Sequence, residues 1–174
     1  MQQDKAEMQG TQQFPSLWRI PIHTDRENLH KISVEIINRY LGVPYQVTGR
    51  SMEGTDCYGL ILMIYKDLGY NLFDISENYN DDWSSEGKNF FYENYYKEWD
   101  IVEKPEPFDV VLFHNGMGIV NHGGVLLTQG KLIQTGKAGT VVVNIDNESM
   151  KKRIEGFYTL RALRRLREQN HDNN

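Results

Sequence analysis

The chain has 174 residues, which suits one domain of ordinary size, and 39% of them are hydrophobic, enough for a packed core. Its net charge of -5 excludes a general nucleic-acid-binding protein, because neutralising phosphates requires a basic face. The single cysteine excludes an intrachain disulfide and a cysteine-rich zinc site, and we expect neither a metal nor an organic cofactor.

Residues 1–23 indicate a flexible lead-in to the domain. The first 13 of them, MQQDKAEMQGTQQ, are polar and contain no apolar run, so they predict no signal peptide. No stretch of the sequence has the roughly 20 apolar residues of a membrane span. The lone thiol suits a reducing compartment.

A first helix is predicted from residue 24. Thr24 and Glu27 form a T-x-x-E capping box at its start, and Gly42 and Pro44 end it. Five apolar residues between these limits recur at helical spacing: Leu29, Ile32, Ile36, Ile37 and Tyr40. Residues 43–56 are rich in turn formers and are predicted to be a loop.

A second helix is predicted over residues 57–68. Asp56 ends the preceding loop and suits the N-cap position, and Gly69 suits the C-terminal cap. Five residues share one face of this helix: Cys57, Leu60, Ile61, Ile64 and Leu68.

An aromatic-rich insertion follows, at about residues 71–105. Phe91, Tyr95 and Trp99 have the spacing of one helical face. The insertion either packs on the core or forms a wall of a substrate groove, where aromatic rings would stack on sugar or peptide.

The rest of the chain is predicted to form strands at 109–113, 123–128, 131–135, 140–145 and 157–163, with Gln129-Gly130 as a two-residue hairpin loop. Helices first and strands later predict an α+β fold, with the N-terminal helices packed on a C-terminal antiparallel sheet. The basic stretch 161–167 indicates a solvated face, and residues 166–174 a polar C-terminal tail.

Cys57 is the first candidate for chemistry, because it lies at the predicted start of a helix. Free backbone N–H groups and the helix dipole favour negative charge there. We therefore expect a lowered thiol pKa and a thiolate that acts as nucleophile. The alternative interpretation is a buried cysteine that only packs.

His122 opens a predicted strand, and the two glycines after it leave room for a ligand close to the backbone. A 128–131 closing pair would place His122 and Gln134 at the end of the hairpin far from its turn. There the Gln134 amide oxygen would accept an imidazole N–H and fix the tautomer that a base needs. An ordinary strand-end histidine and a polar strand residue are the alternatives.

Together these segments resemble the signature of the NlpC-type murein endopeptidases, small papain-like cysteine peptidases. Residues 42–45 (GVPY), Gly49 and residues 54–60 (GTDCYGL) are similar to the family's G-x-P-Y, glycine-bearing loop and G-x-D-C-x-G-L. Residues 109–113 (DVVLF) resemble its G-D-L-V-F-F strand, and residues 122–126 (HGGVL) its H-V-G-I-Y strand. The resemblance covers residues 29–163 and implies a papain-like NlpC-type fold, with the peptidase domain at 24–165.

The resemblance implies that Cys57 is the nucleophile, His122 the general base and Gln134 the residue that orients it. The Cys57 N–H would supply an oxyanion donor. The substrate implied is a stem peptide of bacterial peptidoglycan.

Three further residues have roles implied by the resemblance. Tyr45 would help to bind substrate or the oxyanion, and Asp56 would help to hold the substrate's amine. Tyr58 stands where the family usually has Ser or Ala, and we expect its bulk to lie near the substrate cleft.

The extended loop at 49–51 and the aromatic insertion resemble the branch encoded by phage and prophage tail genes. This implies phage tail proteins as partners, and a protein made in the bacterial cytoplasm and incorporated in a virion or tail-like particle. A catalytically silent tail protein, and an amidase or acyltransferase on the same scaffold, are alternatives. A zinc site at Cys57, His114 and His122 is a poor alternative, because catalytic zinc needs three close ligands and an open fourth position.

Overall fold

A computed structural model describes residues 25–75, 91 and 97–172, apart from the side chain of His171. Its helices are α1 (Arg26–Tyr40), α2 (Cys57–Asp67), α4 (Glu148–Lys151), α5 (Arg161–Asp172) and the 3-10 turn η2 (Thr128–Gly130). Its strands are β1 (Arg50–Ser51), β2 (Gly54–Thr55), β3 (Trp99–Val102), β4 (Val110–His114), β5 (Val120–Leu126), β6 (Lys131–Gly136), β7 (Gly139–Asn144) and β8 (Ile154–Leu160).

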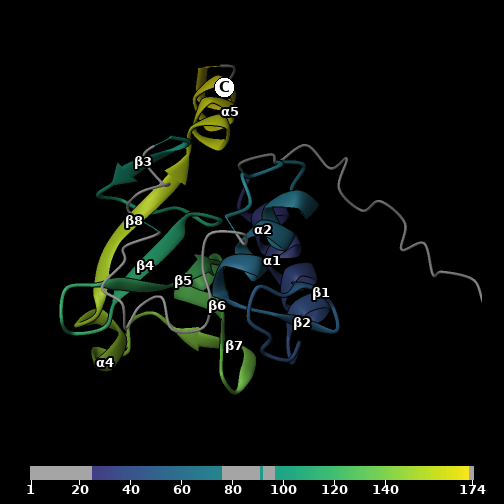
Figure 1. The fold of residues 1–174 in the computed structure, drawn as a ribbon. Coiled ribbons are helices and arrows are strands. Elements are labelled where there is room, and N and C mark those ends of the chain that lie inside the picture. The colour runs from purple at the N-terminus through teal and green to yellow at the C-terminus, as the bar shows by residue number, and fades with distance from the viewer. Residues whose placement is uncertain (1–24, 76–90, 92–96, 173–174) are drawn as a thin grey trace, which may run out of the picture.

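Six of the strands form one antiparallel sheet in the order β3-β8-β4-β5-β6-β7, and β1 and β2 form a separate two-stranded ribbon. Both long N-terminal helices lie to one side of the large sheet (Figure 1). The predicted α+β fold, with N-terminal helices on an antiparallel sheet, is therefore confirmed. No helix among the described residues is both long and apolar enough to cross a membrane.

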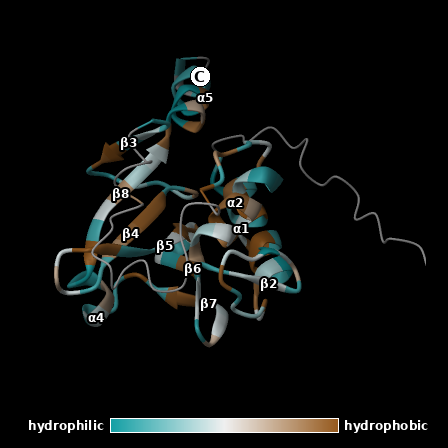
Figure 2. Cartoon of the chain, viewed as in Figure 1, coloured by the Kyte–Doolittle hydropathy of each residue, from teal (hydrophilic) through white to brown (hydrophobic). Residues whose placement is uncertain are grey.

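The sheet buries apolar side chains on both faces. Alternate residues of β4 separate into two clusters: Val110 and Leu112 join the helices, whereas Val111 and Phe113 pack with Leu126 on the opposite face. This alternation follows from the two-residue repeat of a strand. The brown colour of β4 and α2 marks the apolar elements that meet in the centre of the domain (Figure 2).

α1 begins one residue later than the predicted capping box. Asp25 is the N-cap, and its carboxylate accepts a hydrogen bond from the Asn28 N–H at 2.8 Å, whereas Thr24 lies outside the described residues. The helix ends at Tyr40, as predicted, before Gly42 with a φ of +82°. The Tyr40 hydroxyl donates to the Asp67 carboxylate, which joins the C-terminal ends of α1 and α2.

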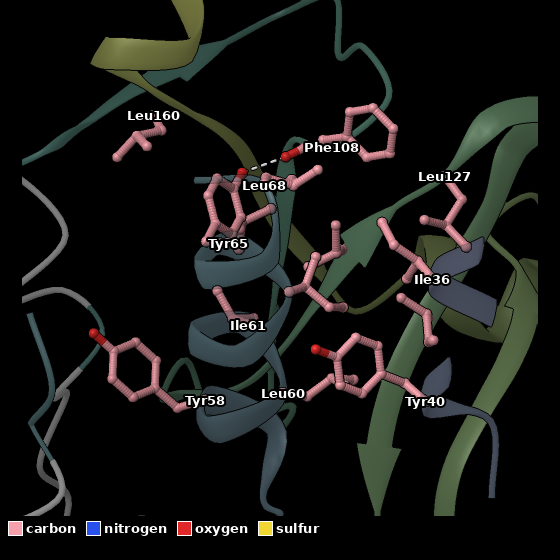
Figure 3. Close-up of a cluster of buried hydrophobic side chains, with 14 of the residues drawn as sticks. Ile36, Tyr40, Tyr58, Leu60, Ile61, Tyr65, Leu68, Phe108, Leu127 and Leu160 are labelled. Atoms are coloured by element: carbon pink, nitrogen blue, oxygen red, sulfur yellow. Dashed lines mark hydrogen bonds between the residues drawn. The ribbon is translucent and has the colours of Figure 1, made fainter. Parts of the chain in front are cut away.

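α2 is the central element of the core. It spans nearly the predicted residues, with Asp56 as N-cap and Gly69 just past its end at a φ of +88°. Leu60, Ile61 and Ile64 are fully buried in the apolar cluster that α2 forms with α1 and the sheet. Figure 3 shows this packing around α2.

Two secondary-structure predictions in this part of the chain are corrected. The predicted loop 43–56 contains the β1-β2 ribbon. Trp99 begins strand β3 rather than continuing a helix. Its ring packs edge-on against the Tyr65 ring, with 5.1 Å between the two ring centres. Phe91 is buried, but Tyr95 and most of the aromatic insertion lie outside the described residues.

The C-terminal prediction is also wrong in part. The strand predicted to reach residue 163 ends at Leu160, and α5 replaces both its end and most of the predicted polar tail. The basic stretch is not simply solvated, since Arg167 donates to the buried Asp109 carboxylate at 2.9 Å and to the Thr159 hydroxyl at 3.0 Å. These bonds anchor α5 to the sheet end from which it extends (Figure 1).

Replacing Tyr65 by phenylalanine should destabilise the fold. The Tyr65 hydroxyl donates to the Phe108 carbonyl inside the core (Figure 3), where Phe108 has a φ of +75°. Tyr65→Phe leaves that buried carbonyl without its donor, which should cost about 1–3 kcal/mol of unfolding free energy. Urea denaturation should show a lower midpoint with an unchanged slope. Tyr70→Phe, in a half-buried neighbouring ring, is the matched control and should change the midpoint less.

Candidate functional site

Cys57 is the first residue of α2, and its side chain is half-buried. The backbone N–H groups of Gly123 and Tyr58 lie near its sulfur, and both lower the pKa of the thiol. Gly123 lies in β5 directly after His122. The fold therefore brings the sulfur to a point one residue along the strand from the predicted base.

Close packing at this point depends on Gly123 lacking a side chain. A Cβ on residue 123 would lie 3.2 Å from the Ile61 Cδ1 atom of α2 and 3.1 Å from Leu112 Cδ2. Both contacts are tighter than ordinary van der Waals separation, so a larger residue would require the ends of the Ile61 and Leu112 side chains to shift. The glycine therefore allows α2 and β5 to pack closely beside Cys57.

The expected lowering of the Cys57 pKa is not what the structure indicates. Burial, and then the neighbouring Asp56 carboxylate, raise the pKa of the thiol to about 12. The N–H donors of Gly123 and Tyr58 and the positive charge of Arg50 oppose this rise but do not overcome it. Burial and the Asp56 charge therefore favour the neutral thiol of Cys57 over the thiolate.

His122 and Gln134 are joined as the sequence predicts. The His122 Nε2 atom lies 2.7 Å from the Gln134 Oε1 atom. An amide oxygen only accepts hydrogen bonds, so Nε2 carries the proton and Nδ1 is the free basic nitrogen. This is the tautomer that a general base needs, held by a bond from the neighbouring strand.

The hairpin that makes this contact differs from the prediction by one residue. Its turn has three residues, Thr128–Gly130, with Gln129 and Gly130 in the left-handed region, and Leu126 pairs with Leu132. The predicted 128–131 closing pair was therefore wrong. It would have put Gln134 on the face opposite His122, since a slip of one residue exchanges the faces of a strand.

Gly124 makes room for this contact. A Cβ on residue 124 would lie 3.1 Å from the Gln134 Cβ atom and 2.7 Å from the Ile133 carbonyl oxygen. Gln134 therefore lies across from Gly124, and its side chain passes over the glycine to the diagonal neighbour His122. The sequence signal for this, two consecutive glycines after the histidine, was present but did not give the register.

Burial lowers the pKa of His122, while the Gln134 hydrogen bond raises it and Arg153 lowers it further. The Phe113 ring lies 5.8 Å from the imidazole, between ring centres, on the neighbouring strand β4. His122 is therefore neutral in the resting protein, which leaves Nδ1 able to accept a proton.

Tyr45 lies beside the start of α2, because it forms an isolated parallel bridge with Thr55. Asp56 is 5% exposed, and its carboxylate accepts hydrogen bonds from the backbone N–H groups of Gly59 at 2.7 Å and Thr48 at 2.8 Å. Arg50 also donates to it, at 3.0 Å. Asp56 thus caps α2, and the roles expected for Tyr45 and Asp56 toward substrate stay predictions.

Tyr58 does not present its bulk as expected. Its side chain is 8% exposed, its hydroxyl donates to the Phe73 carbonyl, and its ring packs edge-on against Phe91 at 5.9 Å. Figure 3 shows it on the side of α2 away from Leu60. Tyr58 therefore supports the fold from the core, and a role in substrate binding stays a prediction.

Arg50 contacts the Asp56 carboxylate, a role that the sequence did not predict. Among the described residues, no three His, Cys, Asp or Glu side chains are grouped so that they could hold a metal ion. His114 is instead engaged locally, with its Nδ1 atom accepting a hydrogen bond from the Gly116 N–H at 3.1 Å.

The sequence profile of the NlpC/P60 family matches residues 42–159, which is more than half of the chain. The chain belongs to the NlpC/P60 family. No protein with a curated function matches it. The matched segment runs from the loop after α1 through β8, so it contains Cys57, His122 and Gln134.

Solved structures share the fold at low sequence identity. A lipoprotein-like protein of the NLP/P60 family from Staphylococcus aureus is 20% identical with a TM-score of 0.56, over 81% of this chain and 44% of that one. An NlpC/P60 protein from Bacillus cereus is 22% identical with a TM-score of 0.50, over 72% and 39%. The P60 domain of an antigen from Mycobacterium avium subspecies paratuberculosis is 16% identical with a TM-score of 0.51, over 77% and 95%.

The chain therefore spans less than half the length of the first two of these proteins, whereas it covers nearly all of the isolated P60 domain. What the structural comparison shows is the fold of one domain.

Changes at Gln134 should move the His122 pKa in opposite directions. Gln134→Leu removes the hydrogen bond that raises this pKa, so it should fall. Gln134→Glu places a carboxylate at the same distance from the imidazole, so the His122 pKa should rise. Titration of the imidazole resonances by nuclear magnetic resonance measures both, with His122→Asn to assign the signal. Equal pKa values in the two variants would contradict the contact.

The raised thiol pKa predicts the pH dependence of alkylation. Only the thiolate reacts, so the rate of iodoacetamide labelling of Cys57 should be low at neutral pH and rise tenfold per pH unit. It should keep rising beyond pH 8.5, where an ordinary thiol levels off. Mass spectrometry of the labelled protein measures the rate, with a short cysteine peptide as reference. A plateau below pH 7 would instead show a resting thiolate–imidazolium pair.

Proposed function

We propose that this domain is a cysteine peptidase that hydrolyses peptide bonds in the stem peptides of bacterial peptidoglycan. The observation that carries the proposal is the His122 imidazole that Gln134 orients, on a strand whose next residue, Gly123, has its backbone N–H beside the Cys57 sulfur. Membership of the NlpC/P60 family supports it, as does the resemblance of the motifs to those of the murein endopeptidases.

The reaction starts from two neutral groups. As the Cys57 sulfur attacks the scissile carbonyl carbon, the thiol proton passes to His122 Nδ1, and the Gln134 oxygen stabilises the imidazolium through Nε2–H. Proton transfer in step with attack avoids a free buried thiolate, which the high pKa of Cys57 disfavours.

The remaining steps use the same residues. The carbonyl oxygen gains negative charge, which the Cys57 N–H at the helix N-terminus is placed to stabilise. His122 then gives its proton to the leaving amine as the C–N bond breaks. Water attacks the thioester with His122 as base, which releases the carboxylate product and restores the thiol.

Delivery by a phage tail is a further part of the proposal. The 49–51 loop and the aromatic insertion support the assignment to the phage and prophage tail branch, with synthesis in the bacterial cytoplasm and incorporation in a virion or tail-like particle. Mass spectrometry of purified tail particles tests it, and repeated failure to detect the polypeptide there would exclude this route.

A catalytically silent domain is a second candidate, and the raised pKa of Cys57 is the observation that favours it. Such a domain would bind peptidoglycan without cutting it. Digestion of isolated peptidoglycan by the purified wild-type protein separates the two functions.

Purified protein should release peptides from isolated peptidoglycan, detected by mass spectrometry. Cys57→Ala removes the nucleophile and should lower the rate by about a thousandfold or more. His122→Ala removes the base and should cost about 100-fold or more. Met117→Ala, at an exposed residue, is the control and should digest at the wild-type rate. Digestion that survives in Cys57→Ala would overturn the mechanism, and none in the wild type would favour the silent domain.

A further inference from the structure

Arg153 lies directly before β8, and three hydrogen bonds fix its position there. Its backbone N–H donates to the Met150 carbonyl at 2.9 Å, and its carbonyl oxygen accepts from the His114 N–H at 2.9 Å. Its side-chain Nε atom donates to the His114 carbonyl at 3.2 Å. The guanidinium is therefore held beside the end of β4, while Nη1 and Nη2 make no hydrogen bond to the described part of the chain.

The charge of Arg153 is not neutralised by a carboxylate of the described residues. Its neighbour Lys151, by contrast, pairs with Asp146. Five other arginines also form salt bridges: Arg39 with Asp67, Arg50 with Asp56 and Asp74, Arg161 with Asp100, Arg164 with Asp100 and Glu168, and Arg167 with Glu106 and Asp109. Because Arg153 is also exposed, its Nη groups are accessible to an anionic ligand.

Strand pairing places Arg153 near the candidate base. Phe113 of β4 pairs with Ile154 of β8 on one side and with His122 of β5 on the other (Figure 1). Neighbouring strands lie about 4.8 Å apart, so the backbone of Ile154 is about 10 Å from that of His122. The Arg153 charge acts on the imidazole, since it adds to burial, the main cause, in lowering the pKa of His122.

Cys57 and Arg153 lie on opposite sides of β5. The N–H and carbonyl of Leu126 bond to residues 108 and 109, on the β4 side of the strand. These groups point to alternate sides along a strand, so the Gly123 N–H points toward β6. The Cys57 sulfur lies near that N–H. Arg153 is on the other side, beyond β4, so His122 lies between the sulfur and the guanidinium.

This order along the sheet orients the substrate of the proposed reaction. The scissile carbonyl carbon must meet the Cys57 sulfur, and the leaving amine takes its proton from His122. The residue that contains this amine therefore extends from His122 toward β4 and Arg153. A guanidinium with two available Nη groups matches a carboxylate in both charge and geometry, because the two can form a pair of parallel hydrogen bonds.

We infer that Arg153 selects substrates whose leaving residue carries a free carboxylate, by binding that carboxylate through Nη1 and Nη2. This inference rests on the proposed function and narrows its substrate class. A stem peptide offers such a group either as its C-terminal carboxylate or as the second carboxylate of a diaminopimelate residue. Amidation removes the negative charge and should therefore weaken binding from either source.

Binding measurements on the Cys57→Ala protein test the inference without requiring turnover. The three ligands are L-alanyl-γ-D-glutamyl-L-lysine, its C-terminal amide, and the same C-terminal amide with meso-diaminopimelate in place of lysine. Calorimetry gives the dissociation constants. At least one of the two ligands with a carboxylate on the third residue should bind about tenfold more tightly than the lysine amide. The ligand that does so identifies the source of the carboxylate.

Arg153→Met, added to Cys57→Ala, removes the guanidinium and should reduce this preference to less than about threefold. Lys152→Met is the matched control, because it removes the same charge from the exposed preceding residue and should keep the full preference. If Arg153→Met does not fold, Arg153→Lys decides. It keeps the charge without the paired Nη groups, so the preference should fall to about threefold, and an unchanged preference would contradict the inference.

Four further results would overturn the inference: no tighter binding of either carboxylate ligand than of the lysine amide, binding of none of the three, an unchanged preference in a folded Arg153→Met protein, or an equal loss in Lys152→Met. Hydrolysis by the protein with Cys57 intact is measured separately. Binding as expected without hydrolysis contradicts the proposed function and leaves the inference standing. Hydrolysis of all three ligands without the binding preference does the reverse.

Discussion

The site depends on how closely the N-terminus of α2 approaches β5. Asp56 caps the helix through the Gly59 N–H, and Gly123 allows Ile61 to pack directly on the strand. Without that contact Cys57 would not lie beside the backbone of the residue after His122. Two features thus fix the geometry together: a side chain that caps the helix N-terminus, and a strand residue that has no side chain.

The same capping arrangement opposes ionisation of the Cys57 thiol. A carboxylate at the N-cap stabilises the helix but lies next to the sulfur, and burial adds to its effect on the thiol pKa. Arg50 offsets part of the negative charge while it orders the loops on either side of Asp56. The start of α2 therefore positions Cys57 as a neutral thiol rather than as a preformed thiolate. The neutral imidazole of His122 is consistent with this protonation state.

The sequence was sufficient for features that local patterns determine. Apolar spacing and the Asp56 cap gave α2 almost to the residue, and the family motif located Cys57, His122 and Gln134. The features that tertiary contacts determine were missed. Gln129 in the left-handed region makes the hairpin turn one residue longer, and Trp99 joins a strand because β8 pairs with it, despite its helical spacing. Arg50 looked like an ordinary loop residue, since its two carboxylates come from different segments.

A neutral Cys57 thiol beside a neutral His122 imidazole affects how the proposed reaction can begin. A preformed thiolate–imidazolium pair would need two opposite charges in a buried site, and the costs of desolvating both are reflected in a raised thiol pKa and a lowered imidazole pKa. When Gln134 holds Nε2–H, the imidazole can receive the thiol proton without reorienting. In the proposed reaction, the charge then forms only as the substrate carbonyl reacts and its oxygen takes up the negative charge. Stabilisation is thus reserved for the transition state, which is the condition under which an interaction accelerates a reaction rather than merely tightening binding.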